Sequence, residues 1–284
     1  MRYCDGGSFA GNNDTVQQYK GSRLHWRGKR VREAIQADLM GSQGMSSATD
    51  LIVSGCSAGG LATYLHTDQW CDALHQKQPG AKCAGLPDSG FFLDYQDPTV
   101  PCSPPSSGDT ANTANSEFNG TAGRLGSTIN GNYHCGLKWT AVTQNVSAGV
   151  NADCVAAHGP DDSWKCMFAE HSSEHIKTPV FAMQSQYDAW QTGHVQGNGG
   201  DAKTQVLGNN ITRIIQDTLM RRNKESGAFL DSCHHHCGSW NSIRIDGDLV
   251  STAIQKWYNG IGSPNNKKLW NQGQKYPCDA CCKP

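Results

Sequence analysis

The stretch "LIVSGCSAGGLATYLHTDQW" at residues 51–70 joins a short apolar run to a helical pattern through a polar segment. The run at 51–53 is typical of a buried strand, and apolar residues recur at helical spacing after Ala58. The G-C-S-A-G segment at 55–59 matches the nucleophile elbow, a sharp strand-to-helix turn that exposes a serine hydroxyl at the edge of a sheet. We therefore predict Ser57 as a nucleophile, with the flanking glycines leaving room for the turn.

The G-x-S-x-G pattern alone is a weak signal, because with 32 Gly in 284 residues it arises by chance in roughly one such chain in three. A serine nucleophile needs an imidazole base and a carboxylate that orients it. In the α/β-hydrolase fold the acid and then the histidine follow later strands. Asp188 follows the apolar run 180–183, and a histidine cluster at 234–236 follows the run 228–232. Order and placement predict a Ser-Asp-His triad.

Alternatives remain open for both partners. Asp161, Asp162 and Glu170 are rival carboxylates, although they precede the 180–183 run. The histidines 234–236 lie between two cysteines and also suit a metal site, but adjacent residues in an extended loop point in different directions, so at most two would face one ion. We predict one histidine as the base, with no metal and no organic cofactor.

Helical and strand patterns alternate along the chain. The expected strands are 51–53, 180–183 and 228–232, and the expected helices are 31–39, 58–74, 211–219 and 249–257. This alternation predicts an α/β fold, specifically an α/β-hydrolase-like, mostly parallel sheet with helices on both faces. At 284 residues, we expect a single domain over 1–284.

The middle of the chain departs from this pattern. Residues 96–132 are rich in Pro, Ser, Thr, Asn and Gly, which predicts a flexible insertion. Cys102 and Cys135 are placed to anchor its ends. Residues 133–170 carry three cysteines and show little periodicity, so we interpret them as a disulfide-tied, cap-like segment.

Composition narrows the class of protein. A net charge of −1 shows no basic excess for nucleic acid, and no apolar run approaches the length of a membrane span. Thirteen scattered cysteines favour disulfides in an oxidising compartment over zinc sites. N-x-S/T sequons open at Asn13, Asn119, Asn145 and Asn210, as in a secreted glycoprotein. The first residues hold no signal-like apolar segment, and the cysteine count is odd, so we expect upstream sequence to be missing.

Several motifs together resemble one family, the pectin acetylesterases and Notum-type carboxylesterases. They are "RYCDGGSFAG" at 2–11, "LHWRG" at 24–28, the elbow at 53–70, "DSGFFLD" at 88–94, "IKTPVFAMQSQYDAWQ" at 176–191, "SCHHHCGSW" at 232–240 and "AIQKWYNG" at 253–260. They run in family order along the whole chain. Retention of Tyr187, Trp190, Gln191 and Cys237 looks more like the plant-type pectin acetylesterases than like Notum.

The resemblance assigns roles to particular residues. The family's S-C-x-x-H-C pattern selects His236, and its Y-D-x-W-Q pattern selects Asp188, with Trp190 and Gln191 as candidate substrate contacts. The backbone N–H of Ala58 supplies half of the oxyanion hole. The other half comes in the family from an upstream Gly-rich loop, for which we find no match here.

The predicted function is therefore a serine carboxylesterase, secreted or in the cell wall, that removes acetyl esters from a polysaccharide such as pectin. Two alternatives belong to other classes. One is a Notum-like deacylase of lipid-modified protein, which a deep apolar pocket beside Ser57 would favour. The other is a non-catalytic carbohydrate-binding remnant. Neither nucleic acid nor membrane is an expected partner, and the oligomeric state stays open.

Overall fold

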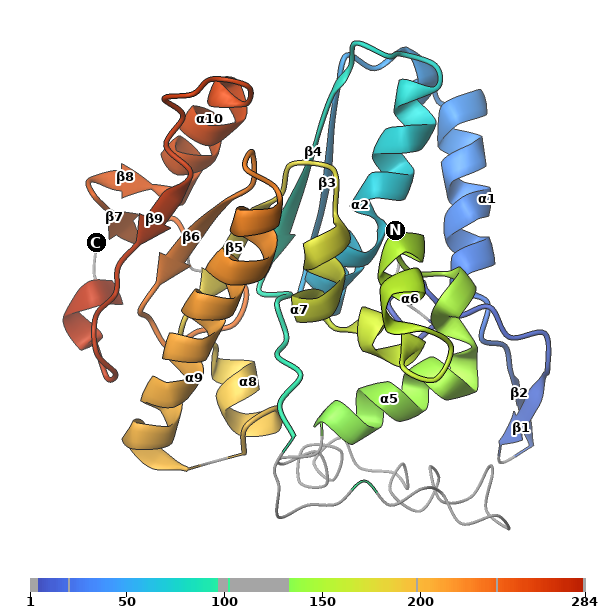
Figure 1. The fold of residues 1–284 in the computed structure, drawn as a ribbon, viewed down its shortest axis with the longest axis horizontal. Helices are drawn as coiled ribbons and strands as arrows, with labels where there is room; N and C mark the ends of the chain where they lie inside the picture. Colours follow the sequence, from blue (N-terminus) through green and yellow to red (C-terminus); the bar gives the residue numbers. More distant parts are fainter. Residues whose placement is uncertain are drawn as a thin grey trace.

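The computed structural model of the chain describes residues 5–19, 21–96, 102, 133–197, 199–238 and 240–282. A five-stranded sheet in the order β3-β4-β5-β6-β9 forms its centre (Figure 1). The strands are β3 Asp50–Cys56, β4 Lys82–Asp88, β5 Phe181–Ser185, β6 Gly227–Asp231 and β9 Leu269–Asn271. Every pairing in this sheet is parallel, so the carboxyl ends of the strands lie at one edge.

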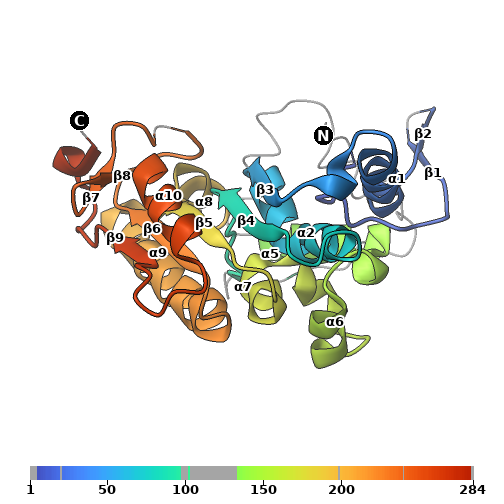
Figure 2. The ribbon, with the colours of Figure 1, turned by 90° about the horizontal axis from the view of Figure 1, so that it is seen from above.

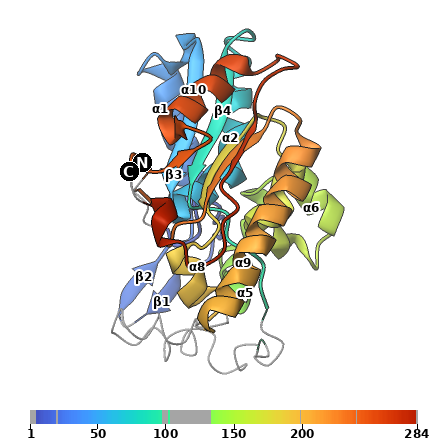
Figure 3. The ribbon, with the colours of Figure 1, turned by 90° about the vertical axis from the view of Figure 1, so that its left-hand side faces the viewer.

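The main helices confirm the expected alternation. They are α1 Gly28–Gly41, α2 Ala58–His75, α8 Ala189–His194, α9 Gly200–Ile215, continued by the π-helical turn η5 Gln216–Met220, and α10 Val250–Gly260. Helices α9 and α10 lie on opposite sides of the sheet (Figures 2 and 3). The α/β-hydrolase-like fold, with a parallel sheet flanked by helices, is confirmed.

Strand residues alternate between two apolar cores because successive side chains point to opposite faces of a sheet. In β6, Ala228 and Leu230 join the core beneath α2 and α9, whereas Phe229 joins the core beneath α10. Each core consists of buried apolar side chains. The sheet is thereby fixed from both sides, and its carboxyl edge becomes a rigid base for loops.

The remaining elements are short. They are the hairpins β1 Gln17–Tyr19 with β2 Ser22–Leu24 and β7 Arg244–Ile245 with β8 Asp248–Leu249, and the 3-10 turns η1 Met45–Ser47 and η6 Asp279–Cys282. These pieces and β9 were not expected from the sequence. Strands of two or three residues are too short to show a period, so only their packing reveals them.

The segment after residue 132 contains more helix than its sequence indicated. It holds α5 Tyr133–Gln144, η2 Val146–Ala148, α6 Ala152–His158, η3 Ser163–Met167, α7 Ala169–Ser172 and η4 Ser173–His175. Helix α5 buries only Leu137, Ala141 and Gln144, so its apolar stripe is weak. Figure 1 shows α5 beyond the carboxyl ends of the strands. The insertion predicted at 96–132 lies outside the described residues, apart from residues 96 and 102.

Disulfides tie these parts together. The pairs are Cys56–Cys237, Cys71–Cys83, Cys102–Cys135, Cys154–Cys166, Cys233–Cys282 and Cys278–Cys281. The expected link between Cys102 and Cys135 is present. The thirteenth cysteine, Cys4, lies outside the described residues. None of the described helices is both long and apolar enough to cross a bilayer.

Candidate active site

Ser57 occupies the turn between β3 and α2. Its backbone has φ 57° and ψ −120°, an uncommon conformation for a residue with a side chain. The Ser57 N–H donates to the carbonyl oxygen of Asp88 at 2.9 Å, which anchors the turn to the end of β4. A Cβ atom on Gly55 would lie 2.5 Å from the carbonyl oxygen of Gly59. The strained strand-to-helix geometry expected of an elbow is therefore present, and it requires glycine at 55.

The second position that needs a glycine is residue 60, and not residue 59 as expected. A Cβ atom on Gly59 would meet nothing within 4 Å, so the prediction that a glycine at 59 leaves room for the turn is wrong. On Gly60, by contrast, a Cβ atom would lie 2.5 Å from the Asp88 carbonyl oxygen. The first turn of α2 packs directly against the chain after β4, and this contact excludes any side chain at 60.

Three side chains that are distant in sequence meet at this edge. His236 Nε2 lies 2.8 Å from Ser57 Oγ, and His236 Nδ1 lies 2.8 Å from Asp188 Oδ2 and 3.0 Å from Oδ1. Ser57 follows β3, Asp188 begins α8 just after β5, and His236 lies in the loop after β6. The carboxyl ends of parallel strands converge there, and this topology brings the three together.

Asp188 is fully buried, and its oxygens are supplied with donors. As the N-cap of α8, it accepts the backbone N–H groups of Trp190 and Gln191 at 3.0 and 2.9 Å. The Gln184 side-chain amide donates to Oδ2 at 3.1 Å. The carboxylate is thus held in one orientation toward His236, and burial leaves neither of its oxygens unpaired.

This geometry selects one tautomer of His236. An ionised carboxylate only accepts hydrogen bonds, so Nδ1 carries the proton that faces Asp188. The lone pair on Nε2 then faces Ser57 Oγ, whose hydroxyl donates to it. In this arrangement the imidazole can take the hydroxyl proton as the oxygen attacks.

Ala58 is the first residue of α2. The first N–H groups of a helix have no intrahelical acceptor, and among the described residues we find none that accepts from the Ala58 N–H. Ser8 Oγ donates to the Ala58 carbonyl oxygen at 3.1 Å, so the 5–9 turn contacts the elbow from the other side. The Ala58 N–H can therefore donate a hydrogen bond to a negatively charged oxygen next to Ser57.

An aromatic wall borders His236. Its members are Phe92 in the loop after β4, Tyr133 at the start of α5 and Trp190 in α8. The ring centroids of Phe92 and Trp190 lie 6.2 and 6.1 Å from that of His236. His194 stacks on the outer side of Trp190 at 4.8 Å. Trp190, a predicted substrate contact, therefore lies beside His236. Phe92 and Tyr133 were not predicted near it: the DSGFFLD motif that contains Phe92 was given no role at the site, and no quoted motif contains Tyr133.

Gln191 has a different position from the one expected for a substrate contact. It is fully buried, its Oε1 accepts the Leu93 N–H at 3.1 Å and its Nε2 donates to the Phe91 carbonyl at 3.0 Å. Both ends of the amide are used by the backbone of the 91–93 segment. Gln191 thus supports the loop that carries Phe92, and it does not offer its amide to a ligand.

A polar cluster joins the same loop to the helical segment. Asp94 accepts hydrogen bonds from His134 of α5 and from His171 of α7, the latter at 2.9 Å. Burial alone would raise the pKa of Asp94, but the hydrogen bonds from His171 and His134 lower it. Two of the alternative candidates for the triad acid have other partners here or nearby. Glu170 accepts the Asp94 N–H, and Asp162 pairs with Lys165. The third rival, Asp161, is exposed in a turn.

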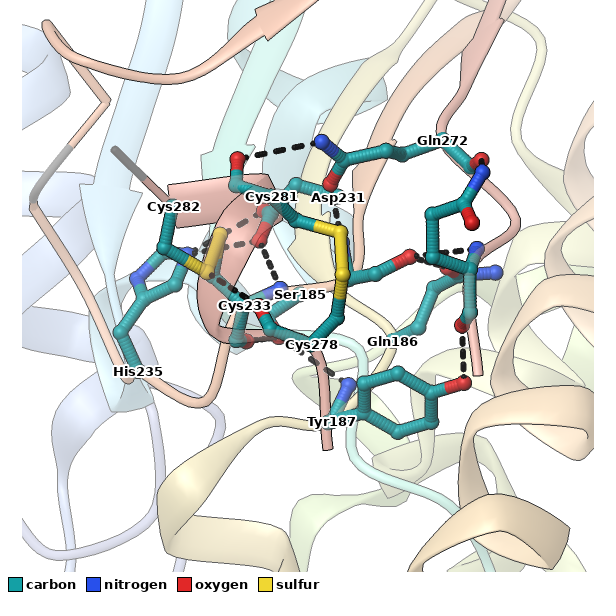
Figure 4. Close-up of a disulfide and its surroundings, with 12 residues drawn as sticks. Ser185, Gln186, Tyr187, Asp231, Cys233, His235, Gln272, Cys278, Cys281 and Cys282 are labelled. Atoms are coloured by element: carbon teal, nitrogen blue, oxygen red, sulfur yellow. Dashed lines mark hydrogen bonds and ion pairs between the residues drawn. A yellow bond between two sulfur atoms is a disulfide. The ribbon is translucent and has the colours of Figure 1, made fainter. Parts of the chain in front are cut away.

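The other two histidines of the cluster have separate partners. His234 is exposed and contacts Thr192 Oγ1 at 3.1 Å. His235 Nε2 lies 3.1 Å from Oδ2 of the fully buried Asp231, beside the Cys233–Cys282 disulfide (Figure 4). The three rings thus diverge, as expected of adjacent residues in a loop. The Asp231–His235 pair was missed, although Asp231 lies within the predicted strand 228–232 and ends β6.

Among the described residues, two clusters each bring three potential metal-ligand atoms within 4.8 Å of one another. They are Cys56 with Asp88 and Cys237, and Cys154 with His158 and Cys166. In both clusters the cysteines are joined as a disulfide. A metal is bound by thiolate, so neither set supplies sulfur ligands in this state.

Comparison with known proteins was made on the whole chain. The family model described as pectinacetylesterase matches residues 1–283. Pectin acetylesterase 5 of Arabidopsis thaliana is 30% identical over 309 residues, covering 99% of this chain and 62% of the relative. Pectin acetylesterase 4 of the same plant is also 30% identical, over 99% of this chain and 65% of the relative.

A more distant relative is the palmitoleoyl-protein carboxylesterase notum1 of Xenopus laevis, 23% identical over 98% of this chain and 51% of the relative. The chain thus spans less than two thirds of the length of these curated relatives. The match runs through the elbow and through the loops that hold Asp188 and His236. The chain belongs to the pectinacetylesterase family.

Proposed function

We propose that this chain is a serine carboxylesterase that removes acetyl esters from a cell-wall or extracellular polysaccharide such as pectin. One observation carries the proposal: the unbroken hydrogen-bond relay from Asp188 through His236 to Ser57 at the carboxyl edge of the sheet. Membership of a family named for pectin acetylesterase supports the substrate class. Six disulfides support an oxidising, extracellular location.

In the proposed reaction His236 Nε2 takes the hydroxyl proton as Ser57 Oγ attacks the ester carbonyl carbon. The tetrahedral oxyanion is stabilised by the Ala58 N–H at the start of α2. Protonated His236 then gives its proton to the departing sugar oxygen, leaving an acetyl-enzyme. Water, deprotonated by His236, attacks the acetyl group and releases acetate, while Asp188 stabilises the imidazolium in both steps. No step requires a metal or an organic cofactor.

Trp190 is the proposed contact for a sugar ring or for the acyl group. Its indole is half-buried and lies next to His236. We further propose that the whole chain acts as one domain and that 133–170 acts as a cap. The position of α5 beyond the strand ends supports the cap (Figure 1).

A Notum-like deacylase is the second candidate, and the aromatic wall is the observation that favours it. Tyr133 and Trp190 are partly exposed aromatic rings that pack on the buried Phe92 near His236, and their apolar surface also suits a longer acyl chain. Hydrolysis of p-nitrophenyl acetate and p-nitrophenyl decanoate distinguishes the two. A higher kcat/KM for acetate supports the polysaccharide acetylesterase, and a higher value for decanoate supports the deacylase.

The decisive test is acetate release from acetylated pectin by the folded chain, with Ser57→Ala as the matched control. We expect release by the parent chain and none above background by the variant. A serine-directed fluorophosphonate should label the parent at Ser57 alone. Equal release by both proteins would refute the mechanism, and pectin binding without release or labelling would indicate a non-catalytic carbohydrate-binding protein.

A further inference from the structure

The two reacting residues are each adjacent in sequence to one half of a disulfide. Cys56 directly precedes Ser57, Cys237 directly follows His236, and the two cysteines are bonded across a sequence separation of 181. The elbow and the histidine loop come from opposite ends of the chain. This bond therefore limits how far His236 can move from Ser57, independently of the hydrogen bond between them.

The end of β4 makes a second connection between the same two segments. The Asp88 carbonyl accepts the Ser57 N–H, and the Asp88 carboxylate accepts Trp240 Nε1 at 3.0 Å. The Ser89 hydroxyl donates to Asp88 Oδ1 at 2.9 Å and accepts the Cys237 N–H at 3.0 Å. Ser89 is fully buried, and its hydroxyl is held between the Asp88 carboxylate and the Cys237 N–H.

We propose that the Cys56–Cys237 disulfide and the Ser89 hydroxyl are positioning elements that hold His236 against Ser57, and that opening the disulfide lowers ester hydrolysis reversibly. The proposal rests on the esterase function proposed above. Proton transfer requires the 2.8 Å contact between His236 Nε2 and Ser57 Oγ. A displacement of the loop by about 1 Å is enough to cost roughly 10²-fold in rate.

The bond is also open to a reductant. Cys56 is exposed and Cys237 half-buried, whereas the Cys71–Cys83 and Cys154–Cys166 pairs are buried. The Cys102–Cys135 and Cys278–Cys281 pairs are half-buried, so peptide mapping must follow each bond separately. A thiolate of a small dithiol attacks one sulfur of the bridge and forms a mixed disulfide. Its second thiol then closes the oxidised dithiol ring. Cys56 and Cys237 leave as thiols, having received two electrons and two protons from the dithiol.

The test is a titration of the intact chain with dithiothreitol. Samples are split for alkylation with iodoacetamide and peptide mass mapping, and for p-nitrophenyl acetate kinetics. We expect kcat to fall by roughly 10²-fold in proportion to alkylation at Cys56 and Cys237, with KM changed by less than about threefold. Reoxidation should restore kcat. Complete alkylation of both cysteines with unchanged kcat would overturn the proposal.

Variants separate positioning from general stability. Cys56→Ser/Cys237→Ser should lower kcat by a similar factor, whereas the control Cys71→Ser/Cys83→Ser, between α2 and the start of β4, should not. Ser89→Ala keeps a residue with a Cβ at φ 50° and removes only the acceptor, so we expect a kcat loss of about tenfold. All assays are run below the melting temperature of each variant. If a variant fails to fold, the titration of the intact chain still decides.

A readout that does not need turnover separates this proposal from the esterase function. The imidazole ¹⁵N signals of His236, assigned by their loss in His236→Gln, report its tautomer and titration. We expect these signals to shift when the Cys56–Cys237 bond is reduced, and signals that stay unchanged would refute the positioning role. Absence of ester hydrolysis by the oxidised chain would instead refute the esterase function.

Discussion

Two buried aspartate–histidine pairs lie side by side at the carboxyl edge of the sheet, and only one of them meets a hydroxyl. Asp188 accepts Nδ1 of His236 and leaves Nε2 facing Ser57. Asp231 accepts Nε2 of His235 instead, which leaves a buried Nδ1 with no partner among the described residues. The residue types are the same in both pairs. What distinguishes the His236 imidazole from that of His235 is which ring nitrogen remains available and what that nitrogen contacts.

The second pair has the features of a structural support. The His235 ring packs edge-on against the Trp240 ring, with 4.9 Å between the ring centroids. The backbone carbonyl oxygen of His235 accepts the Ala189 N–H at the start of α8. Burial raises the pKa of Asp231. Burial alone would lower the pKa of His235, but the hydrogen bond and the charge of Asp231 raise it. The pair therefore fixes the loop between β6 and His236 from the side away from Ser57.

The largest expected difference between the pairs is in turnover. His236→Gln should lower kcat by roughly 10⁴- to 10⁶-fold, because it removes the base. His235→Gln, the adjacent matched substitution, should retain kcat within about tenfold in the folded fraction. Kinetics with p-nitrophenyl acetate, normalised to folded protein by circular dichroism, measure both. Comparable losses in the two variants would mean that the distinction drawn from ring orientation is wrong.

Substitutions of the two aspartates should differ in kcat in the same direction as those of the two histidines, but by a smaller factor. Asp188→Asn should lower kcat by about 10⁴-fold, because an amide that donates to Nδ1 forces the wrong tautomer on His236. Asp231→Asn acts on a ring that touches no reacting atom, so we expect a loss below about tenfold. The same assay applies. A large loss in Asp231→Asn, with its fold intact, would contradict a supporting role.

For the free energy of unfolding, the order of the two pairs should be the reverse of their order for kcat, with the larger effect at the Asp231–His235 pair. His235→Leu leaves the fully buried Asp231 carboxylate without its imidazole, which should cost about 3–5 kcal/mol in the free energy of unfolding. Denaturant unfolding at pH 7 measures it. The double variant Asp231→Asn/His235→Leu should lose less, because no ionised carboxylate remains buried. An equal or larger loss in the double variant would show that packing, and not charge, explains the effect.

The smallest effect is the pH dependence of that stability. The folded pKa of His235 lies above its unfolded value near 6.5. The contribution of His235 to the free energy of unfolding is therefore complete below about pH 6.5 and is lost as the pH rises through its folded pKa. The difference in unfolding free energy between the parent chain and His235→Leu should shrink from pH 6 to pH 9. A difference that grows over this range would show that the sign of the shift is wrong.

The sequence alone was enough for the framework. Short apolar runs between polar loops predicted the strands around 51–53, 180–183 and 228–232. The elbow motif and the chain order predicted that Ser57 meets a later carboxylate and one of the histidines at 234–236, and the family resemblance selected Asp188 and His236. Local geometry and strand direction determine these features, and both depend on short stretches of sequence.

Tertiary structure decided the rest. Gln191 resembled a ligand contact beside Asp188, yet its amide is used by the backbone of 91–93. Phe92 packs near His236, and Tyr133 packs on Phe92, from segments far apart along the chain, and no spacing rule connects them. The orientation of the His235 and His236 rings depends on which buried carboxylate each one meets. Adjacent residues share a sequence context, so only the packing of the loop against separate strands could assign their roles.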